Sequence, residues 1–266
     1  MLNESMIQQN LKSAAFNKPI RIHVLDSVDS TNQFLKDLPA NDSIEVCCAE
    51  TQTKGRGRFG RSWHSPFGEN IYFSLRWHFD CDISQLSGLG LVVSMAILAA
   101  LNDADICEDV RIKWPNDLIW KNQKLCGSLI EVIGERDVGT DVVIGIGLNV
   151  NSPINKLALR DYPCCSLYEI TGTHFDRNPL IAKLIIWLDQ YLQQFITKGF
   201  SSFIPIWQQA DYLHGQLITV SQPTGSLSGQ ANGVNEAGQL ILIDKMGVTH
   251  YLSSGDTSLR MVTKQL

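Results

Sequence analysis

The hydrophobic residues of the chain recur with two different periods, which divide it into helical and extended segments. Over Pro179–Ile196 they return every three to four positions, so this segment is predicted to be an amphipathic helix. Ser84–Leu101 is apolar through most of its length and is predicted to be a buried helix. A third helix is predicted over Thr31–Leu38, because Ser30 and Gln33 match the S-x-x-Q capping box that opens a helix.

Runs of strand-forming residues separate these helices. Residues 1–20 precede the first run and are expected to form a short helix or a frayed arm. Two runs are expected to form a hairpin that turns at Lys121 and Asn122. Because strands and helices mix without regular βαβ alternation, the pattern favours an α+β fold over a doubly wound sheet. The predicted strands of this part are 21–25, 44–49, 70–79, 110–114, 118–120, 125–133 and 142–150.

After Trp207 the pattern changes to short apolar runs that are punctuated by glycine. This texture predicts a small all-β module that starts near residue 213. We therefore expect two domains, residues 1–212 and residues 213–266. The runs in the second domain are 217–220, 229–234, 239–243 and 248–252.

Composition and charge narrow the class of protein. With 266 residues, of which 44% are hydrophobic, the chain is long enough for a core and too apolar to be disordered. Its 22 basic and 27 acidic side chains give a net charge of −5, which argues against a general nucleic-acid binder. No apolar stretch reaches the ~18 residues expected of a membrane span, and no signal peptide is visible. We expect a cytoplasmic protein without membrane contact.

The cysteines agree with that location. There are seven, two pairs are adjacent and no C-x-x-C spacing occurs, so neither a disulfide framework nor a zinc site is indicated. Most are expected to be small buried side chains. No metal-ligating residues are predicted.

Positive charge gathers in a glycine-rich segment, Gly55-Arg-Gly-Arg-Phe-Gly-Arg61, which we call the Arg-Gly loop and which lies close to Trp63. It satisfies G-x-G-x-x-G, but a dinucleotide fingerprint leads into a helix, which Ser65-Pro-Phe-Gly68 prevents here. Glycines let the backbone approach a ligand, and arginine forks match carboxylate or phosphate oxygens. We interpret the loop as a site for an anionic ligand; a solvated basic loop is the alternative.

A second group of charges lies at Lys113-Trp-Pro-Asn-Asp117, followed by Lys124-Leu-Cys-Gly127. A lysine at a strand end, a turn, and a hairpin that returns a second lysine would bring two cations and a carboxylate into one region. An ordinary Pro-Asn turn with exposed lysines is the alternative. A third segment, Gly145-Ile-Gly-Leu-Asn-Val-Asn151, ends an apolar strand and is a weak signal by itself.

In this order, these segments strongly resemble the biotin protein ligases, the bacterial enzymes that join biotin to a lysine of a carrier protein. The resemblance covers roughly residues 22 to 262. The Arg-Gly loop and the Lys-Trp-Pro-Asn-Asp motif are specific for the family together and only moderately so alone. The matching residues are Ser30-Thr-Asn32, Gln52, Gly55 to Arg61, Trp63, Lys113 to Asp117, Lys124 to Gly127 and Gly147-Leu-Asn149.

The resemblance implies a two-step reaction. The carboxylate of biotin attacks the α-phosphate of ATP to give biotinyl-AMP and pyrophosphate. A lysine of the biotin carboxyl carrier protein of acetyl-CoA carboxylase then attacks the mixed anhydride. Mg²⁺ is implied as the counter-ion of ATP, without a dedicated metal site. The implied fold is a mixed-sheet catalytic domain of the biotin/lipoate ligase type followed by a small SH3-like β barrel, as a monomer or a homodimer.

The resemblance also assigns roles to residues of this sequence. Trp63 is expected to pack against the adenylate and Asn149 to face the adenine. Asp117 is expected either to hold the lysines in register or to lie near the incoming amine. The expected catalytic residues are Lys124, Arg58, Lys113 and Asp117. The expected biotin contacts are Ser30, Thr31, Asn32, Gln52, Gly55, Arg56, Gly57, Arg58, Lys124 and Gly127. The expected nucleotide contacts are Arg56, Arg58, Arg61, Trp63, Lys113, Asn149 and Arg260.

The sequence departs from the family pattern at a few positions. Phe59 stands where some members carry a further arginine, and Cys126 stands where alanine is common. We expect Cys126 to be a small wall residue rather than a reactive thiol. Only about twenty residues precede the first predicted strand, so no DNA-binding domain and no DNA binding are expected. The alternative functions are a lipoate or octanoate ligase or transferase, and a non-catalytic biotin or nucleotide sensor.

Overall fold

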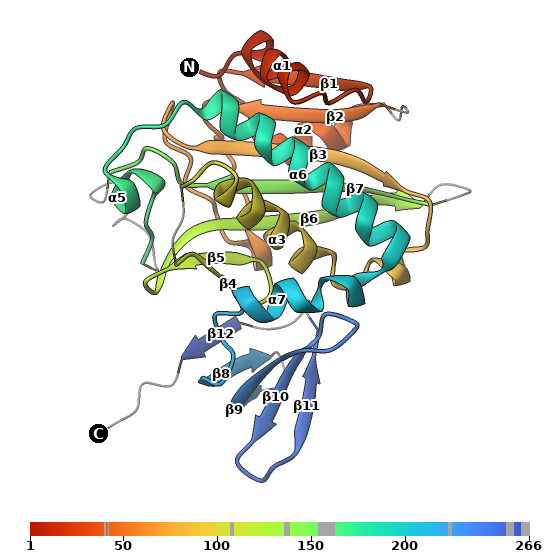
Figure 1. Cartoon of the computed structure of the whole chain (residues 1–266), viewed down its shortest axis with the longest axis vertical. Coiled ribbons are helices and arrows are strands. Elements are labelled where there is room, and N and C mark those ends of the chain that lie inside the picture. Colours follow the sequence, from red (N-terminus) through yellow and green to blue (C-terminus); the bar gives the residue numbers. More distant parts are fainter. Residues whose placement is uncertain are drawn as a thin grey trace.

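A seven-stranded mixed sheet forms the centre of the molecule in the computed structural model (Figure 1). Its order is β1-β2-β3-β7-β6-β5-β4, with β1 and β2 parallel and all other neighbours antiparallel. Each strand lies within two residues of its predicted bounds, so the α+β prediction is confirmed. The strands are β1 (Ile20–Leu25), β2 (Ile44–Ala49), β3 (Ile71–Phe79), β4 (Arg111–Lys113), β5 (Asp117–Trp120), β6 (Gln123–Glu135) and β7 (Thr140–Leu148).

The structure describes residues 1–39, 41, 43–106, 109–135, 139–153, 163–222, 225–253 and 258–261. Of residues 135, 222 and 258–261 it describes only the backbone.

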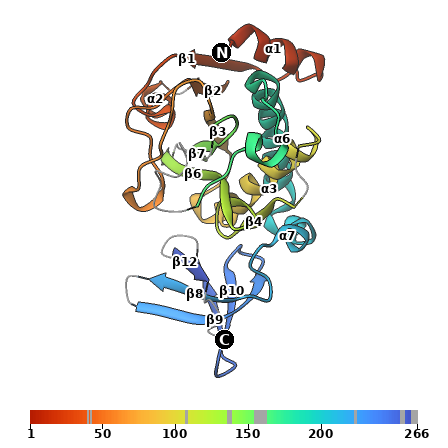
Figure 2. The same ribbon diagram turned by 90° about the vertical axis from the view of Figure 1, so that its left-hand side faces the viewer.

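Helices cover the two faces of the sheet unequally (Figure 2). The long helices α3 (Leu89–Asn102) and α6 (Arg177–Lys198) pack together over one face, and the short α2 (Thr31–Asp37) lies on the other. Leu35 of α2 is fully buried against Cys47 and Val143, which anchors α2 to the sheet. The remaining helices are α1 (Glu4–Ser13), α5 (Leu167–Thr171) and α7 (Ile204–Ala210), with the 3-10 turns η1 (Arg58–Gly60), η2 (Ile83–Leu86) and η3 (Phe200–Phe203).

The prediction of one continuous helix over Ser84–Leu101 was wrong. The segment forms η2 and then α3, with a break at Ser87 and Gly88. Gly88 has φ 85° and packs against the ring of Phe200. A Cβ added to Gly88 would lie 2.6 Å from Cδ2 of that ring. Since a left-handed residue cannot continue a right-handed helix, the chain turns there before α3 begins.

The hairpin prediction at Lys121 and Asn122 was confirmed. Both residues have positive φ, 44° and 66°, as a two-residue type I′ turn between β5 and β6 requires. This turn returns the chain so that Lys124 lies beside β5.

A second, five-stranded antiparallel sheet follows in the C-terminal part, with the order β11-β10-β9-β8-β12 (Figure 1). Two hydrogen bonds join its β9–β10 turn to the first part: Trp114 Nε1 donates to Gly238 O at 3.1 Å, and Ser87 Oγ to Ala237 O at 2.6 Å. The domain boundary near residue 213 stays a prediction. The strands are β8 (Leu217–Gln222), β9 (Gly225–Val234), β10 (Leu240–Asp244), β11 (Thr249–Leu252) and the unpredicted β12 (Ser258–Met261).

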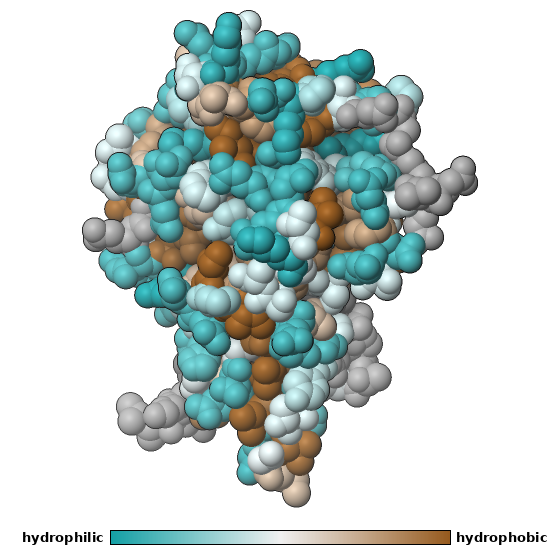
Figure 3. All heavy atoms as spheres, turned by 45° about the vertical axis from the view of Figure 1, so that its right-hand side comes forward, coloured by the Kyte–Doolittle hydropathy of each residue, from teal (hydrophilic) through white to brown (hydrophobic). Residues whose placement is uncertain are grey.

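The surface is mostly hydrophilic on the face that Figure 3 shows, with apolar areas broken up by polar side chains. Large exposed apolar side chains near the β10–β11 turn include Met246, Val248 and Tyr251. Among the described residues, none of the helices combines the length and the hydropathy that a membrane crossing needs.

Candidate active site

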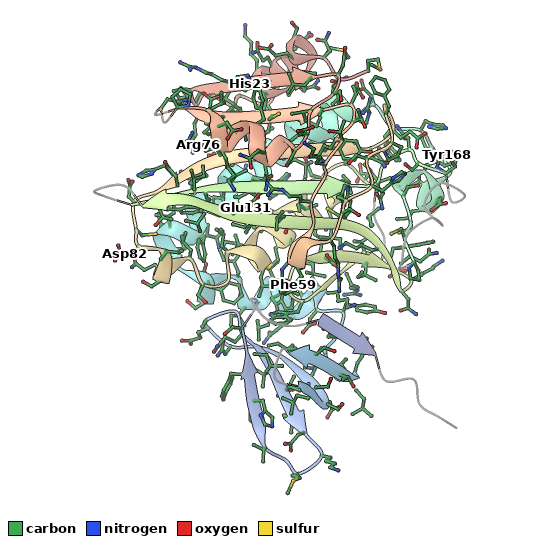
Figure 4. The ribbon with its side chains drawn as sticks, turned by 180° about the vertical axis from the view of Figure 1, so that it is seen from behind. His23, Phe59, Arg76, Asp82, Glu131 and Tyr168 are labelled. Carbon is green, nitrogen blue, oxygen red and sulfur yellow. The ribbon has the colours of Figure 1, made fainter. Side chains whose placement is uncertain are left out.

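A cavity of about 330 Å³ lies on the α2 face of the sheet, between the Arg-Gly loop and strands β4 to β7. This is the size of a small-molecule site. In Figure 4, the label of Glu131 locates β6, and the label of Phe59, which lines the cavity, locates the Arg-Gly loop. The predicted site residues that line it are Ser30, Thr31, Asn32, Gln52, Arg56, Gly57, Arg58, Arg61, Trp63, Lys113, Asp117, Lys124 and Gly127.

The register of β4, β5 and β6 builds the cationic wall of the cavity. Lys113 pairs with Asp117 across β4 and β5, and Asp117 pairs with Gly127 across β5 and β6. The hairpin turn returns Lys124, whose Nζ lies 2.6 Å from Asp117 Oδ1. The two cations and the carboxylate that the sequence predicted for one region therefore do come together.

Burial sets the charge state of one of these lysines. It lowers the pKa of Lys113, and the positive charges of Lys124 and Arg61 act in the same direction, while Asp117 opposes them. The ammonium of Lys113 is therefore poorly compensated in the protein, so it favours an added anion.

Glycines on β6 and β7 form the floor of the cavity by omitting side chains. A Cβ on Gly145 would lie 2.2 Å from Asn32 Oδ1, and a Cβ on Gly147 would lie 2.3 Å from Trp63 Cε2. A Cβ on Gly127 would lie 2.9 Å from Lys124 Nζ. The Gly-Ile-Gly segment, a weak signal in the sequence, thus makes room for two predicted binding residues.

A chain of hydrogen bonds holds the α2 wall. Ser30 caps α2 by accepting from the backbone N–H of Gln33, and the backbone N–H of Thr31 donates to Gln52 Oε1 at 2.9 Å. Ser74 Oγ of β3 lies 2.7 Å from Thr31 Oγ1 and donates to Asn32 Oδ1 at 2.6 Å. Ser74 was missed by the sequence analysis, because it belongs to no local motif and meets its partners on α2 only in the folded protein.

The Arg-Gly loop approaches the cavity from the other side. Gly55, the first residue of the loop, is buried, and a Cβ there would lie 2.6 Å from Trp63 O. Arg56 lies 3.4 Å from Glu131 Oε2, and Arg58 Nη1 donates to Asn116 Oδ1 at 3.1 Å. After η1 the chain enters β3 rather than a helix, which confirms that the G-x-G-x-x-G match is not a dinucleotide fingerprint.

Asn116 is a second residue that the sequence analysis did not assign. Its amide Nδ2 donates to Ser128 O on β6 while its Oδ1 accepts from Arg58. It therefore connects the Lys-Trp-Pro-Asn-Asp turn to the Arg-Gly loop. The motif itself was the available signal, since an Asn in a turn beside two charged groups has a polar side chain to place.

Three of the described residues that the sequence analysis singled out, Gly55, Asn149 and Cys126, are not among those that line the cavity. Asn149 is fully buried, and its Nδ2 donates to Lys124 O at 3.3 Å and Cys165 O at 2.9 Å, so it braces the strand that carries Lys124. Cys126 packs in the hydrophobic core instead of the cavity wall, and burial raises the pKa of its thiol, which makes it unreactive. The side chain of Arg260 lies outside the described residues.

Comparisons with known proteins agree with this architecture. Residues 24–149 match the biotin/lipoate A/B protein ligase family. The biotin protein ligase of Aquifex aeolicus, solved in complex with biotin and ATP, superposes with a TM-score of 0.77 at 29% identity, covering 91% of this chain and 99% of that one. The fold and the cavity therefore define a protein of the biotin/lipoate ligase class.

The curated relatives narrow this class. The bifunctional ligase/repressor BirA of Escherichia coli (strain K12) is 33% identical over 244 residues, which cover 91% of this chain and 75% of that protein. The biotin–[acetyl-CoA-carboxylase] ligase of Mycobacterium tuberculosis is 29% identical over 222 residues, which cover 79% and 77%. The chain belongs to the biotin protein ligases.

Proposed function

We propose that this protein is an ATP-dependent biotin protein ligase. It forms biotinyl-AMP from biotin and ATP and transfers the biotinyl group to a lysine of the biotin carboxyl carrier protein of acetyl-CoA carboxylase. The observation that carries the proposal is the charge of the cavity. In a chain of net charge −5, five cations and one carboxylate are among its lining residues. The two reactants of the first step are both anions, so they need such a site to approach each other.

In the first step a carboxylate oxygen of biotin bonds to the α-phosphorus of ATP while the bond to pyrophosphate breaks. Lys113 and Lys124 stabilise the negative charge that develops on the phosphate oxygens, and Arg58 closes the opposite side. Asp117 keeps Lys124 in place through the 2.6 Å ion pair. No covalent bond to the enzyme is required, since positioning of the reactants and charge stabilisation account for the acceleration of the reaction.

In the second step the amine of the acceptor lysine attacks the carbonyl carbon of biotinyl-AMP. An amide bond forms, AMP leaves, and the amine loses a proton. Asp117 is the carboxylate among the described lining residues, and we assign it to the surroundings of this amine. Trp63 provides a flat surface for the adenylate beside Lys124, whose Nζ lies 5.5 Å from the ring centroid.

The biotin ring is assigned to the wall that α2 and Gln52 form. Thr31 donates to Gln52, and Ser74 contacts both Thr31 and Asn32, so the remaining polar atoms of this wall are preorganised for a ureido group or a similar polar ring. Mg²⁺ enters with ATP as the counter-ion of the triphosphate.

The other parts of the proposal concern location and assembly. Cys47, Cys48, Cys81 and Cys126 are free thiols, as is typical of a reducing compartment, which supports a cytoplasmic location. The protein acts as a monomer or a homodimer, and the division into residues 1–212 and 213–266 follows the separation of the two sheets.

Incubation of the purified protein with Mg²⁺, ATP and either radiolabelled biotin or radiolabelled lipoate tests the function. Biotinyl-AMP and, after a carrier domain is added, a biotinylated carrier lysine are expected. Formation of lipoyl-AMP without biotinyl-AMP would assign the protein to the lipoate ligases. Tight biotin binding without any adenylate would make it a sensor.

A further inference from the structure

Glu131 is a carboxylate beside an anion site, and the reaction described above does not use it. It lies on β6 in the middle of the sheet (Figure 4) and is not among the residues that line the cavity. Its side chain is 19% exposed. A negative charge next to a cavity for two anions opposes binding, so its presence requires a compensating role.

Three donors surround this carboxylate. Asn32 Nδ2 donates to Oε2 at 2.8 Å, Lys36 Nζ lies 3.0 Å from Oε1, and Arg56 Nη2 lies 3.4 Å from Oε2. Burial raises the pKa of Glu131, but the hydrogen bonds from Asn32 and Lys36 and the charge of Arg56 outweigh it and lower the pKa. The group is therefore ionised at neutral pH, and its charge is shared among these donors.

Through Arg56 and Asn32 the carboxylate joins two walls of the cavity that are distant in the sequence. Arg56 belongs to the Arg-Gly loop and also contacts Gln33 Oε1 at 3.4 Å. Asn32 belongs to α2 and is linked through Ser74 to Thr31 and Gln52. A continuous polar chain thus runs from the loop arginine to the predicted biotin contacts, and Glu131 is its only connection to Arg56 by charge among the described residues.

We infer that Glu131 is a positioning residue for biotin activation, which holds the Arg56 guanidinium at the cavity mouth before either anion binds. This inference rests on the proposed function. The carboxylate attracts the arginine towards α2, so less conformational freedom is lost when the loop closes on its ligands. The Lys36 ammonium opposes the charge of Glu131 and the Asn32 amide stabilises it by a hydrogen bond, which limits its repulsion of biotin and ATP.

The test is Glu131→Gln, an isosteric change that keeps an acceptor for Asn32 and removes the charge that holds Arg56. We expect the KM for biotin to rise about tenfold and biotinyl-AMP to dissociate about tenfold faster, while kcat for adenylation changes less than about threefold. A thermal unfolding scan of the same variant measures any loss of fold. A rise in KM without a matching fall in Tm supports positioning, whereas a fall in kcat with KM unchanged overturns it.

Lys36→Gln is the matched control, because it breaks the shorter ion pair to the same carboxylate and leaves Arg56 paired. Wild-type KM and adenylate retention are expected for this variant. If Lys36→Gln reproduces the effect of Glu131→Gln, the carboxylate acts by stabilising α2 and the inference fails.

A double-mutant cycle decides whether Glu131 acts through Arg56. Glu131→Gln is expected to have no further effect on biotin KM in an Arg56→Gln background, since the interaction is already absent there. Additive effects would overturn the inference. The wild-type protein separates this outcome from the larger proposal: no biotinyl-AMP in the wild type refutes the function, whereas an active wild type with an unaltered Glu131→Gln variant refutes only the role of Glu131.

Discussion

Lys113, Asp117 and Lys124 reach the cavity from strands, whereas Arg56 and Arg58 reach it from a loop. The strand residues are fixed by the register of β4, β5 and β6, and the Lys124–Asp117 ion pair measures 2.6 Å. The loop residues depend on longer contacts, 3.4 Å from Arg56 to Glu131 and 3.1 Å from Arg58 to Asn116. Both walls therefore carry positive charge, two lysines offset by one carboxylate on the strands and two arginines on the loop, but their supports differ in stiffness.

Exposure differs in the same direction. The side chain of Lys124 is 18% exposed and that of Arg56 is 42% exposed. Within the loop, Gly57 N donates to Arg61 O and Arg61 N to Arg58 O. Segments with few buried contacts open at low free-energy cost. The comparison suggests a division of labour, in which the strand wall provides preset charge for the chemical step and the loop wall retains what has been bound.

Lys124→Ala tests the strand wall and has the largest expected effect. The variant loses a cation that the proposed mechanism places next to the reacting phosphate, so adenylation is expected to slow by about 1,000-fold. Quenched time courses of biotinyl-AMP formation measure the rate of adenylation. Lys121→Ala is the control, because Lys121 lies on the same hairpin, contacts only the Trp120 ring in the described set and is expected to leave the rate unchanged. Near wild-type adenylation by Lys124→Ala would remove the central catalytic assignment.

Gly147→Ala tests the floor of the cavity, which the glycines of β6 and β7 form between the two walls. The added methyl would meet Trp63 at 2.3 Å, so the indole must shift, and a displacement of about 1 Å can cost about 100-fold in rate. We expect a raised KM for ATP together with a reduced kcat. Gly134→Ala on β6 is the matched control, because no atom lies within 4 Å of its added Cβ. Equal kinetics for the two variants would show that Trp63 needs no fixed place.

The elements of the fold were largely predictable, because strands and amphipathic helices follow the two hydrophobic periods. The exception at Gly88 depends on Phe200, more than one hundred residues away, and no local pattern contains that contact. The short β12 was missed for a similar reason. It is recognised as a strand by its pairing with β8 over Ser258–Met261, and no local pattern contains that pairing.

The site was predictable where its residues form a local motif and not where they are joined only by the fold. Charges that lie close together in the sequence, as in the Arg-Gly loop, can be recognised as a candidate site from the sequence alone. Ser74 and Glu131 lie in long strands outside any local motif, and their partner Asn32 lies 42 and 99 residues away. Asn149 shows that a motif residue can also be assigned wrongly by its motif. The motif assigned it to the adenine, whereas its amide donates to the backbone carbonyl of Lys124.

Arg58→Gly tests the loop wall, with a smaller expected effect. Loss of the guanidinium removes its contact with Asn116 and one positive charge from the cavity lining, so biotinyl-AMP is expected to leave about tenfold faster. Release is measured by filter trapping of labelled adenylate, and stray biotinylation of added lysine should rise with it. Lys54→Ala provides the control, because Lys54 precedes the loop and pairs with the exposed Asp29. Unchanged retention would mean that the strand wall alone holds the intermediate.

The smallest expected effect is a change in the pH profile of adenylation. It distinguishes the strand wall from the loop wall because lysine and arginine differ in pKa. Burial lowers the pKa of Lys113 from the ordinary value of 10.5, so its positive charge is lost at a lower pH than that of an exposed lysine. The rate of adenylation should therefore fall as the pH rises towards that lowered pKa, and the fall should begin below pH 10.5. Arginine stays protonated to a pH of about 12 or higher, so Lys113→Arg should move the alkaline limb upwards while Arg58→Gly leaves it in place. If the wild type and Lys113→Arg share one limb, another group controls it, and the charge of Lys113 is not what the strand wall contributes to the chemical step.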